Sequence, residues 1–195
     1  MTRRIPQLVA IVAIAGAIAW QTAGQAASAN STQTVDGQGR VVTATYQGQQ
    51  IDPAIASHYF CHTRDYPVVR CFDSQAEVDA DLGWIEPTEP GQAAEGTDSG
   101  GDPTSPDWGG GPYTIAYWDI NYGGSALTVY TAVSDLGLLG WDNNISSIKS
   151  VNCGIPRYFV NTGYGGGYWQ NACNVWSPNL YSTNDTFSSV ENMAP

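Results

Sequence analysis

The C-terminal part of the chain, residues 113–195, contains an internal repeat, and this repeat limits the possible folds more than any other feature. A shift of 42 residues places similar residues on one another without a gap. The matches are Tyr117 with Phe159, Tyr122 with Tyr164, Gly123-Gly124 with Gly165-Gly166, Asp142-Asn143 with Asn184-Asp185, Ser146-Ser147 with Ser188-Ser189, and Ile148 with Val190. Because self-similarity at a fixed period marks repeated structural units, we expect two copies of one unit, about 113–152 and 153–195.

Each copy has the composition of short antiparallel strands, with Tyr, Trp, Val and Ile between frequent turn residues. In the first copy we expect strands over Thr114 to Trp118 and Ala126 to Ala132. The turn Asn121-Tyr122-Gly123-Gly124 joins them, and its glycines permit positive φ. A long connection then leads to a strand that starts at Ile148. This order predicts a Greek key, and two Greek keys packed together predict an all-β sandwich.

A polar run in each copy is the main candidate for a binding site. The runs are Asp142-Asn143-Asn144-Ile145-Ser146-Ser147 and Asn184-Asp185-Thr186-Phe187-Ser188-Ser189, which hold carboxylate, amide and hydroxyl oxygens and no basic side chain. Ca²⁺ prefers about 6–8 oxygen ligands, which two such runs and water could supply together. Either run alone is equally typical of turn-forming residues, but their recurrence favours calcium. Zinc is disfavoured because neither run contains His or Cys.

The repeated positions resemble the Greek-key signature of the βγ-crystallin family. That signature is an aromatic residue, a second aromatic five residues later, a glycine two further on, and a distal serine. It occurs twice here, as Tyr117, Tyr122, Gly124 and Ser147 and as Phe159, Tyr164, Gly166 and Ser189. Microbial members add the calcium motif [N/D]-[N/D]-x-x-[S/T]-S, which both polar runs match. The resemblance covers about 113–195, and bacterial spore-coat calcium-binding members look especially similar.

The resemblance implies up to two Ca²⁺ ions, each bound between the two runs. The candidate ligand residues are Asp142, Asn143, Asn144, Ser146, Asn184, Asp185, Thr186 and Ser188. Within this set, the resemblance implies side-chain oxygens from the second positions, backbone carbonyls from Asn144 and Thr186, and hydroxyls from Ser146 and Ser188. Ser147 and Ser189 are expected to hold the hairpins by hydrogen bonds, and hairpin backbone near 118–121 and 160–163 to complete the ligand shells. Asn143 in place of Asp lowers the ligand charge of one site.

The first 29 residues have the pattern of a secretory signal peptide. Arg3 and Arg4 precede an apolar run from Leu8 to Trp20, and Ala27-Ser28-Ala29 is a small-residue cleavage site. The apolar run has thirteen residues, whereas a membrane-spanning helix needs about 20. We therefore expect a secreted, extracellular protein that has no membrane segment in its mature form.

Export implies an oxidising compartment, in which four cysteines predict two disulfides. Three connectivities are possible. We favour Cys61–Cys71 and Cys153–Cys173, because a Pro- and Gly-rich linker separates the two pairs. A zinc site made by the first pair with His58 and His62 is the alternative, and we prefer a disulfide with exposed histidines.

The region between the signal and the repeats divides into three segments. Residues 30–56 are polar and rich in Gln, Thr and Gly, which predicts disorder. Residues 57–85 form a small disulfide-stapled segment, with a hairpin over 58–70 and a helix over 73–82. A capping box of Ser74 and Glu77 opens this helix. Residues 86–112 carry six acids among many Gly and Pro and no base, which predicts a disordered soluble spacer.

Charge and residue types exclude several functions. Seven basic residues face eighteen acidic ones, a net charge of −11, so a nucleic-acid-binding surface is not expected. Both histidines lie outside the repeats, which excludes a His-based triad there, and we expect a non-enzymatic monomer.

Two alternative functions stay open. One alternative is a secreted metalloproteinase inhibitor on a similar fold, whose partner would be an extracellular protease. Another is a killer-toxin-like or glycan-binding module, which would use exposed Trp169 and Trp176 on a cell-surface partner.

Overall fold

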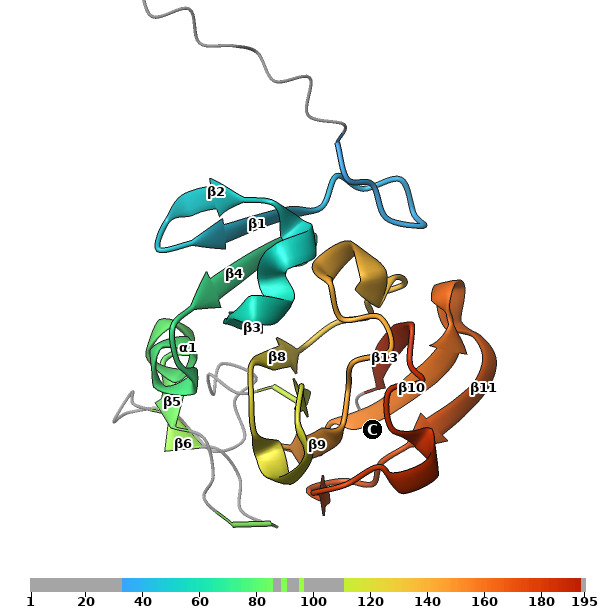
Figure 1. The fold of residues 1–195 in the computed structure, drawn as a ribbon. Coiled ribbons are helices and arrows are strands. Elements are labelled where there is room, and N and C mark those ends of the chain that lie inside the picture. The colour runs from blue at the N-terminus through green and yellow to red at the C-terminus, as the bar shows by residue number, and fades with distance from the viewer. Residues whose placement is uncertain (1–32, 86–88, 91–94, 97–110, 194–195) are drawn as a thin grey trace, which may run out of the picture. The chain divides into compact units, whose positions relative to one another are not determined.

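The computed structural model describes residues 33–85, 89–90, 95–96 and 111–193 (Figure 1). The predicted signal peptide and most of the predicted linker lie outside these residues. Within this part of the chain, none of the helices has the length and apolar character needed to cross a membrane.

The described residues are mostly β-structure. The strands are β1 Thr43–Tyr46, β2 Gln49–Ile51, β3 Phe60–His62, β4 Val68–Phe72, β5 Trp84–Ile85, β6 Glu95–Gly96, β7 Tyr113–Tyr117, β8 Ala126–Val129, β9 Ser147–Val151, β10 Ile155–Asn161, β11 Gly165–Gln170, β12 Trp176–Ser177 and β13 Ser189–Met193. The helices are α1 Gln75–Leu82 and the short 3-10 turns η1 Pro53–His58, η2 Ile120–Tyr122, η3 Leu136–Leu139, η4 Thr162–Tyr164 and η5 Tyr181–Thr183.

The two repeats form two interlocked Greek keys. The larger sheet has the order β12-β9-β7-β8-β3-β4-β1-β2, and the smaller has the order β11-β10-β13. Strand β12 of the second repeat pairs with β9 of the first, while Val133 of the first repeat bridges to Val190 of the second. Each repeat thus adds residues to the sheet of the other, which confirms the predicted all-β sandwich.

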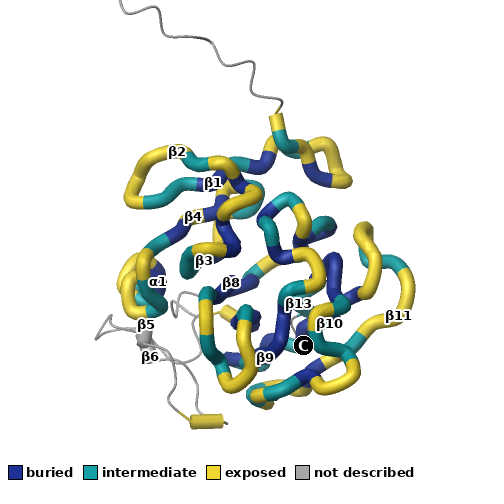
Figure 2. The backbone as a smooth tube through the Cα atoms, viewed as in Figure 1, coloured by how far each residue is buried: buried dark blue, intermediate teal, exposed yellow. Residues whose placement is uncertain are grey.

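The core of the sandwich draws residues from both repeats. One cluster joins Ala116 and Leu127 of the larger sheet with Tyr158 and Val190 of the smaller sheet. All five residues of β7 are buried, because both faces of this strand are covered: Ala116 packs in the cluster between the sheets, and Tyr113, Ile115 and Tyr117 pack with Val78 and Leu82 of α1. Figure 2 shows buried residues also in the neighbouring strand β8.

The predicted disorder over 30–56 is wrong for the described residues 33–56. The alternating side chains of Val42 and Ala44 enter the core, and their exposed fractions are 3% and 0%. Strand β1 turns into β2 through Gln47-Gly48, both at positive φ, and pairs in parallel with β4. The polar composition of this segment does not predict these strands, because they are stabilised by pairing with β4, which lies more than twenty residues later in the sequence.

The segment 57–85 has the predicted hairpin and helix. β3 and β4 pair antiparallel with Cys61 opposite Cys71. Ser74 Oγ accepts a hydrogen bond from the Glu77 backbone N–H, and Gly83 ends α1 at a φ of 73°. Both predicted disulfides, Cys61–Cys71 and Cys153–Cys173, are present.

The N-terminal part of the described chain is joined to the repeats. β3 pairs in parallel with β8, so that Phe60 lies opposite Ala126 and His62 lies opposite Thr128. Residues 33–85 therefore extend the sheet of the first repeat, and we call them the N-terminal module. Strand β6 lies within the predicted linker and pairs with β5, so residues 95–96 are not the plain spacer expected there.

Candidate functional site

Each repeat folds its first hairpin around a pair of aromatic rings. The ring centroids of Tyr117 and Tyr122 are 5.5 Å apart, and those of Phe159 and Tyr164 are 5.8 Å apart, both in edge-to-face contact. Gly166 has a φ of 74°, and a Cβ there would lie 2.6 Å from Val160 Cγ2. The close approach and the positive φ together explain the glycine.

The distal serine of each motif holds its hairpin closed. Ser147 Oγ accepts a hydrogen bond from the Tyr122 N–H at 3.0 Å and donates one to the Asp119 carbonyl at 2.7 Å. The second repeat has the same pair of bonds. Its members are Ser189 Oγ with the Tyr164 N–H at 3.1 Å and with the Asn161 carbonyl at 2.6 Å. The serines thus have the role that the family resemblance assigns to them.

The two polar runs lie side by side and are held to each other by backbone hydrogen bonds. The Asn143 N–H donates to the Phe187 carbonyl at 2.9 Å, and the Asp185 N–H donates to the Ile145 carbonyl at 3.1 Å. Asn143 and Asp185 both have left-handed backbone conformations, with φ of 55° and 54°. Asn and Asp adopt this conformation more readily than other non-glycine residues. The second motif position therefore has the same unusual geometry in both repeats.

Two pairs of oxygen atoms meet at this junction. Ser146 Oγ of the first run donates a hydrogen bond to Asp185 Oδ1 of the second at 3.2 Å. Ser188 Oγ donates to the carbonyl of Val160, a hairpin residue, also at 3.2 Å. We call the group of Asp185 and Ser146 the Asp185 site. Asn143 and Ser188 occupy the equivalent motif positions, and we group them with the Val160 carbonyl as the Asn143 site.

The other residues of the runs make mainly local contacts. Asn143 Nδ2 donates to Asp142 Oδ2 at 3.0 Å, and Asn144 Nδ2 donates to the Asp142 carbonyl at 2.7 Å. Thr186 Oγ1 donates to the Thr183 carbonyl at 2.7 Å. Asn184 Nδ2 donates to Asp185 Oδ2, whereas its buried Oδ1 has no hydrogen-bond partner. The second run therefore contains an oxygen acceptor that is free to take another ligand.

The site contains few carboxylates. Each polar run holds a single Asp. In the described part of the chain, no group of three or more His, Cys, Asp or Glu side chains gathers around one point. A metal held here would rely on hydroxyl, amide and carbonyl oxygens, which suit a hard cation such as Ca²⁺. The Val160 carbonyl lies in the hairpin range 160–163 that the family resemblance indicates, but the sequence does not single it out, because every residue has a backbone oxygen.

Lys149 is another residue that sequence reasoning missed. Its Nζ lies 5.4 Å from the ring centroid of Tyr117, 4.9 Å from that of Tyr122 and 4.3 Å from that of Trp176. This cation–π cluster joins the first repeat to strand β12 of the second.

The two tryptophans considered for glycan binding, Trp169 and Trp176, are half-buried. Trp169 packs near Tyr158 and Phe187, so neither is the exposed aromatic expected for glycan binding.

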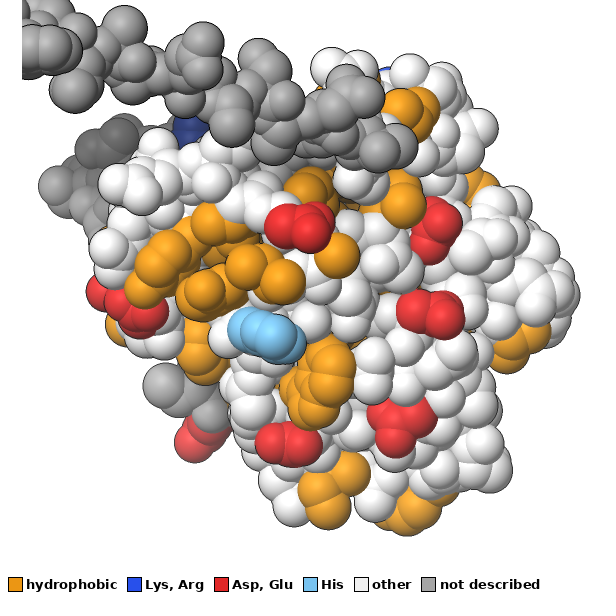
Figure 3. Space-filling view, turned by 45° about the horizontal axis from the view of Figure 1, so that its top comes forward, with side chains coloured by type: hydrophobic (Ala, Val, Ile, Leu, Met, Phe, Trp, Pro, Cys, Tyr) orange, Lys and Arg blue, Asp and Glu red, His pale blue; other side chains and the backbone are white. Residues whose placement is uncertain are grey.

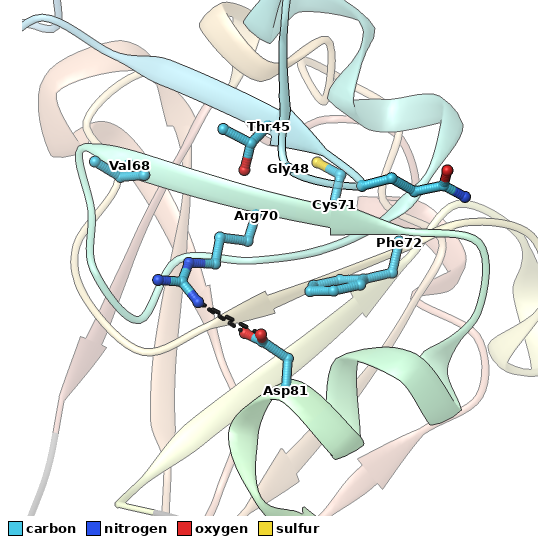
Figure 4. Close-up of a pocket in the computed structure, with 8 residues that line it drawn as sticks. Thr45, Gly48, Val68, Arg70, Cys71, Phe72 and Asp81 are labelled. Atoms are coloured by element: carbon cyan, nitrogen blue, oxygen red, sulfur yellow. Dashed lines mark hydrogen bonds and ion pairs between the residues drawn. The ribbon is translucent and has the colours of Figure 1, made fainter.

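A pocket of about 370 Å³ lies in the N-terminal module, away from the polar runs (Figure 4). Arg70 and Asp81 line this pocket, and Arg70 Nη1 lies 3.3 Å from Asp81 Oδ2. The buried His62 lies behind Asp81, with its Nε2 2.9 Å from the same oxygen. Burial lowers the pKa of His62, although its contact with Asp81 acts in the opposite direction. His62 is buried rather than exposed as predicted, and both thiols of the alternative zinc set are in a disulfide.

The molecular surface agrees with the acidic composition. In Figure 3, acidic side chains are spread over the visible face, and Lys or Arg side chains are nearly absent from it. This face has no basic patch of the kind that binds nucleic acid.

Neither a protein-family model nor a curated protein matches the chain. Among solved structures, 33 chains match. One is the βγ-crystallin from Ciona intestinalis, with 31% identity over 42% of this chain and 99% of that chain, at a TM-score of 0.38. The chain belongs to the βγ-crystallin family. This assignment rests on the sequence identity over a whole family member and on the doubled motif, not on the superposition.

Other βγ-crystallins show the same extent of match. A βγ-crystallin from an archaeon has 24% identity over 43% of this chain and 100% of that chain, with a TM-score of 0.39. A double mutant of a βγ-crystallin domain from Clostridium beijerinckii has 24% identity over 43% of this chain and 98% of that chain, with a TM-score of 0.38. The matches cover less than half of this chain, so the N-terminal module has to be explained from its own contacts.

Proposed function

We propose that this βγ-crystallin is a calcium-binding protein in which Ca²⁺ stabilises the two Greek keys. The observation that carries the proposal is the 3.2 Å contact between Ser146 Oγ and Asp185 Oδ1, which come from different repeats. Two oxygens that bind one Ca²⁺ at about 2.3–2.6 Å lie about 3.0–3.5 Å apart. The 3.2 Å contact between Ser188 Oγ and the Val160 carbonyl has the same spacing, as a second site requires.

The two proposed sites differ in charge. The Asp185 site has a carboxylate at the second motif position, whereas the Asn143 site has a neutral amide there. Backbone carbonyls of Asn144 and Thr186 would add a ligand to each site, as the family resemblance implies. Because ligand charge raises Ca²⁺ affinity, we expect the Asp185 site to bind more tightly.

The proposed action of calcium is on stability rather than on chemistry. A ligand that binds only the folded state adds about 2.7 kcal/mol of stability at a concentration one hundred times its Kd. Extracellular modules often bind Ca²⁺ in the range of about 10⁻⁴–10⁻³ M, so millimolar calcium would suffice.

Secretion and the absence of catalysis belong to the same proposal. The two disulfides indicate an oxidising environment, and the apolar run from Leu8 to Trp20 supports export. Neither histidine lies in the repeats, and His62 is already held by Asp81. A binding role with calcium as ligand fits these residues better than an enzymatic role.

Calorimetric titration with CaCl₂ tests the proposal after treatment of the protein with a chelator. We expect two bound ions in the unaltered chain. In Asp185→Asn, which keeps the size of the side chain and removes its charge, the tighter site should weaken towards the affinity of the Asn143 site. Asp65→Asn, a change at an exposed acid of the N-terminal module, is the matched control and should leave both affinities unchanged. No heat from the unaltered chain would contradict the proposal. Inhibition of a thermolysin-like protease in the same preparation would favour the inhibitor alternative.

A further inference from the structure

From the packing between η1 and η3 we propose that the N-terminal module positions the Asn143 site and sets its calcium affinity, while the Asp185 site is independent of the module. The inference rests on the proposed calcium function, which it extends to the part of the chain outside the βγ-crystallin repeats.

The module meets the first repeat at a close contact directly before the first polar run. η1 packs against η3, which are the cyan and the gold coil in Figure 1. Gly140 follows η3 with a φ of 74°, and a Cβ there would lie 2.2 Å from the Ala54 carbonyl and 2.6 Å from Ser57 Oγ. Ser125 Oγ also donates a hydrogen bond to the Ser57 carbonyl. The first repeat therefore needs a glycine at this position in order to accommodate η1.

The segment from η3 to the first polar run carries Asn143 and is bonded to Ser188, the two side chains of the Asn143 site. The Leu136 N–H, at the start of η3, donates to the Ser188 carbonyl at 2.8 Å. The Trp141 N–H donates back to the Leu136 carbonyl at 2.9 Å, which fixes the chain just before Asn143. A shift of η3 would thus move Asn143 and Ser188 relative to each other. Both side chains belong to one site, so its ligand geometry depends on the position of η3.

The second repeat provides an internal control. η5 precedes the second polar run as η3 precedes the first. Leu139 in η3 is 0% exposed, whereas Tyr181, which follows it by 42 residues and begins η5, is 81% exposed. The same part of the repeat is thus covered in one copy and open to solvent in the other. The run that follows η5 carries Asp185, and Ser146, the other member of the Asp185 site, is held by its N–H to the Tyr117 carbonyl of β7 at 3.0 Å. The Asp185 site therefore has support that does not come from η3.

Coupling between the module and the site is reciprocal. If docking of η1 favours the geometry that binds calcium at the Asn143 site, calcium at that site must favour docking to the same extent. Energetic coupling between sites typically changes affinity by about 5–150-fold. For a contact formed by one short turn, we expect an effect of about tenfold, near the low end of this range.

The test changes the module and measures calcium at each site separately. Asp185→Gly leaves only the Asn143 site, and Asn143→Gly leaves only the Asp185 site. Glycine accepts the positive φ that both positions have, so neither change adds backbone strain. Ala56→Leu then overpacks η1, in which Ala56 is 0% exposed and belongs to the same core cluster as Leu139. Calorimetry with CaCl₂ gives the affinity in each combination.

We expect Ala56→Leu to weaken calcium binding about tenfold in Asp185→Gly and by less than about twofold in Asn143→Gly. Gly140→Ala changes the first repeat instead of the module, and its Cβ would clash with the Ala54 carbonyl of η1. This variant should reproduce the pattern if Ala56→Leu does not fold. Gly48→Ala is the matched control. Gly48 has a φ of 76°, and a Cβ there would have no atom within 4 Å, so this variant adds the strain of Gly140→Ala without the clash. It should leave both affinities unchanged.

The outcomes separate the inference from the proposed function. Absence of calcium binding in the unaltered chain would overturn both. Normal binding in Asp185→Gly that Ala56→Leu and Gly140→Ala leave unchanged would overturn the inference alone. Equal weakening of both sites would also overturn it, because general destabilisation would then explain the effect. Melting curves in chelator show that each variant is folded before titration.

Discussion

Asp185→Gly is the most informative single change, because it removes the carboxylate that we propose binds calcium and adds no strain at the positive φ of this residue. Asp185 has a φ of 54°, where most substitutions other than Gly or Asn add strain. For alanine the left-handed conformation costs about 1–2 kcal/mol. Glycine does not have this steric cost, so the variant removes the carboxylate together with its hydrogen bonds from Ser146 and Asn184.

The size of the effect follows from ligand linkage. At a calcium concentration one hundred times Kd, loss of one site removes about 2.7 kcal/mol of stability. For a domain of about 150–250 residues, 1 kcal/mol shifts Tm by about 2–4 °C, so the calcium-induced rise in Tm should shrink by about 5–11 °C. The assay is differential scanning calorimetry of both proteins with calcium and with chelator. An equal rise in Tm for the two proteins would refute the assignment of Asp185 as a ligand.

Three further predictions concern stability in chelator. Ser147→Ala removes two hydrogen bonds and should cost about 1–3 kcal/mol by urea unfolding, whereas an unchanged midpoint would refute the role of Ser147 in the hairpin. Gly166→Ala should cost more than Gly163→Ala, because both have positive φ but only the Cβ at 166 meets other atoms; equal losses would show that the contact is unimportant. Burial lowers the pKa of His62 below its ordinary 6.5, so the unfolded chain binds the proton first and stability should fall as pH decreases below about 6.5. His62→Gln should flatten this part of the pH profile, and an unaltered slope between about pH 7 and 5.5 would assign it to other groups.

The repeated hairpins could be predicted from the sequence because their determinants are local. Gly124 and Gly166 are needed for turns within a few residues, and Ser74 caps a helix that begins at the next residue. Because the two copies match at a constant shift of 42 residues, a structure predicted for one copy could be transferred to the other residue by residue. Local signals that agree with one another are the kind that a single sequence makes visible.

The N-terminal module shows where such reasoning fails. Val42 and Ala44 are the buried residues of a segment whose composition is otherwise polar, and the strand pairs with β4, more than twenty residues later. The pairing of β3 with β8 likewise joins residues that a long linker separates. Strand propensity depends strongly on the neighbouring strands, and a sequence does not show which strands these are.

The candidate site lies between these two cases. The motif residues Asn143, Ser146, Asp185 and Ser188 could be identified from their types and spacing, and the structure brings them together across the two repeats. The family resemblance indicates hairpin backbone over 160–163 without naming the Val160 carbonyl, and it gives no sign of the contact with η1. A backbone oxygen has no signature in the sequence, and the contact at Gly140 depends on a module that lies far upstream.

The most direct test of the calcium assignment is a calorimetric Ca²⁺ titration of residues 30–195 after removal of bound metal, with a melting curve at each end. We predict two bound ions and a higher Tm in the presence of calcium, with the tighter binding lost in Asp185→Gly. Absence of heat together with an unchanged Tm would contradict the account and would leave the two polar runs as turns that only join strands.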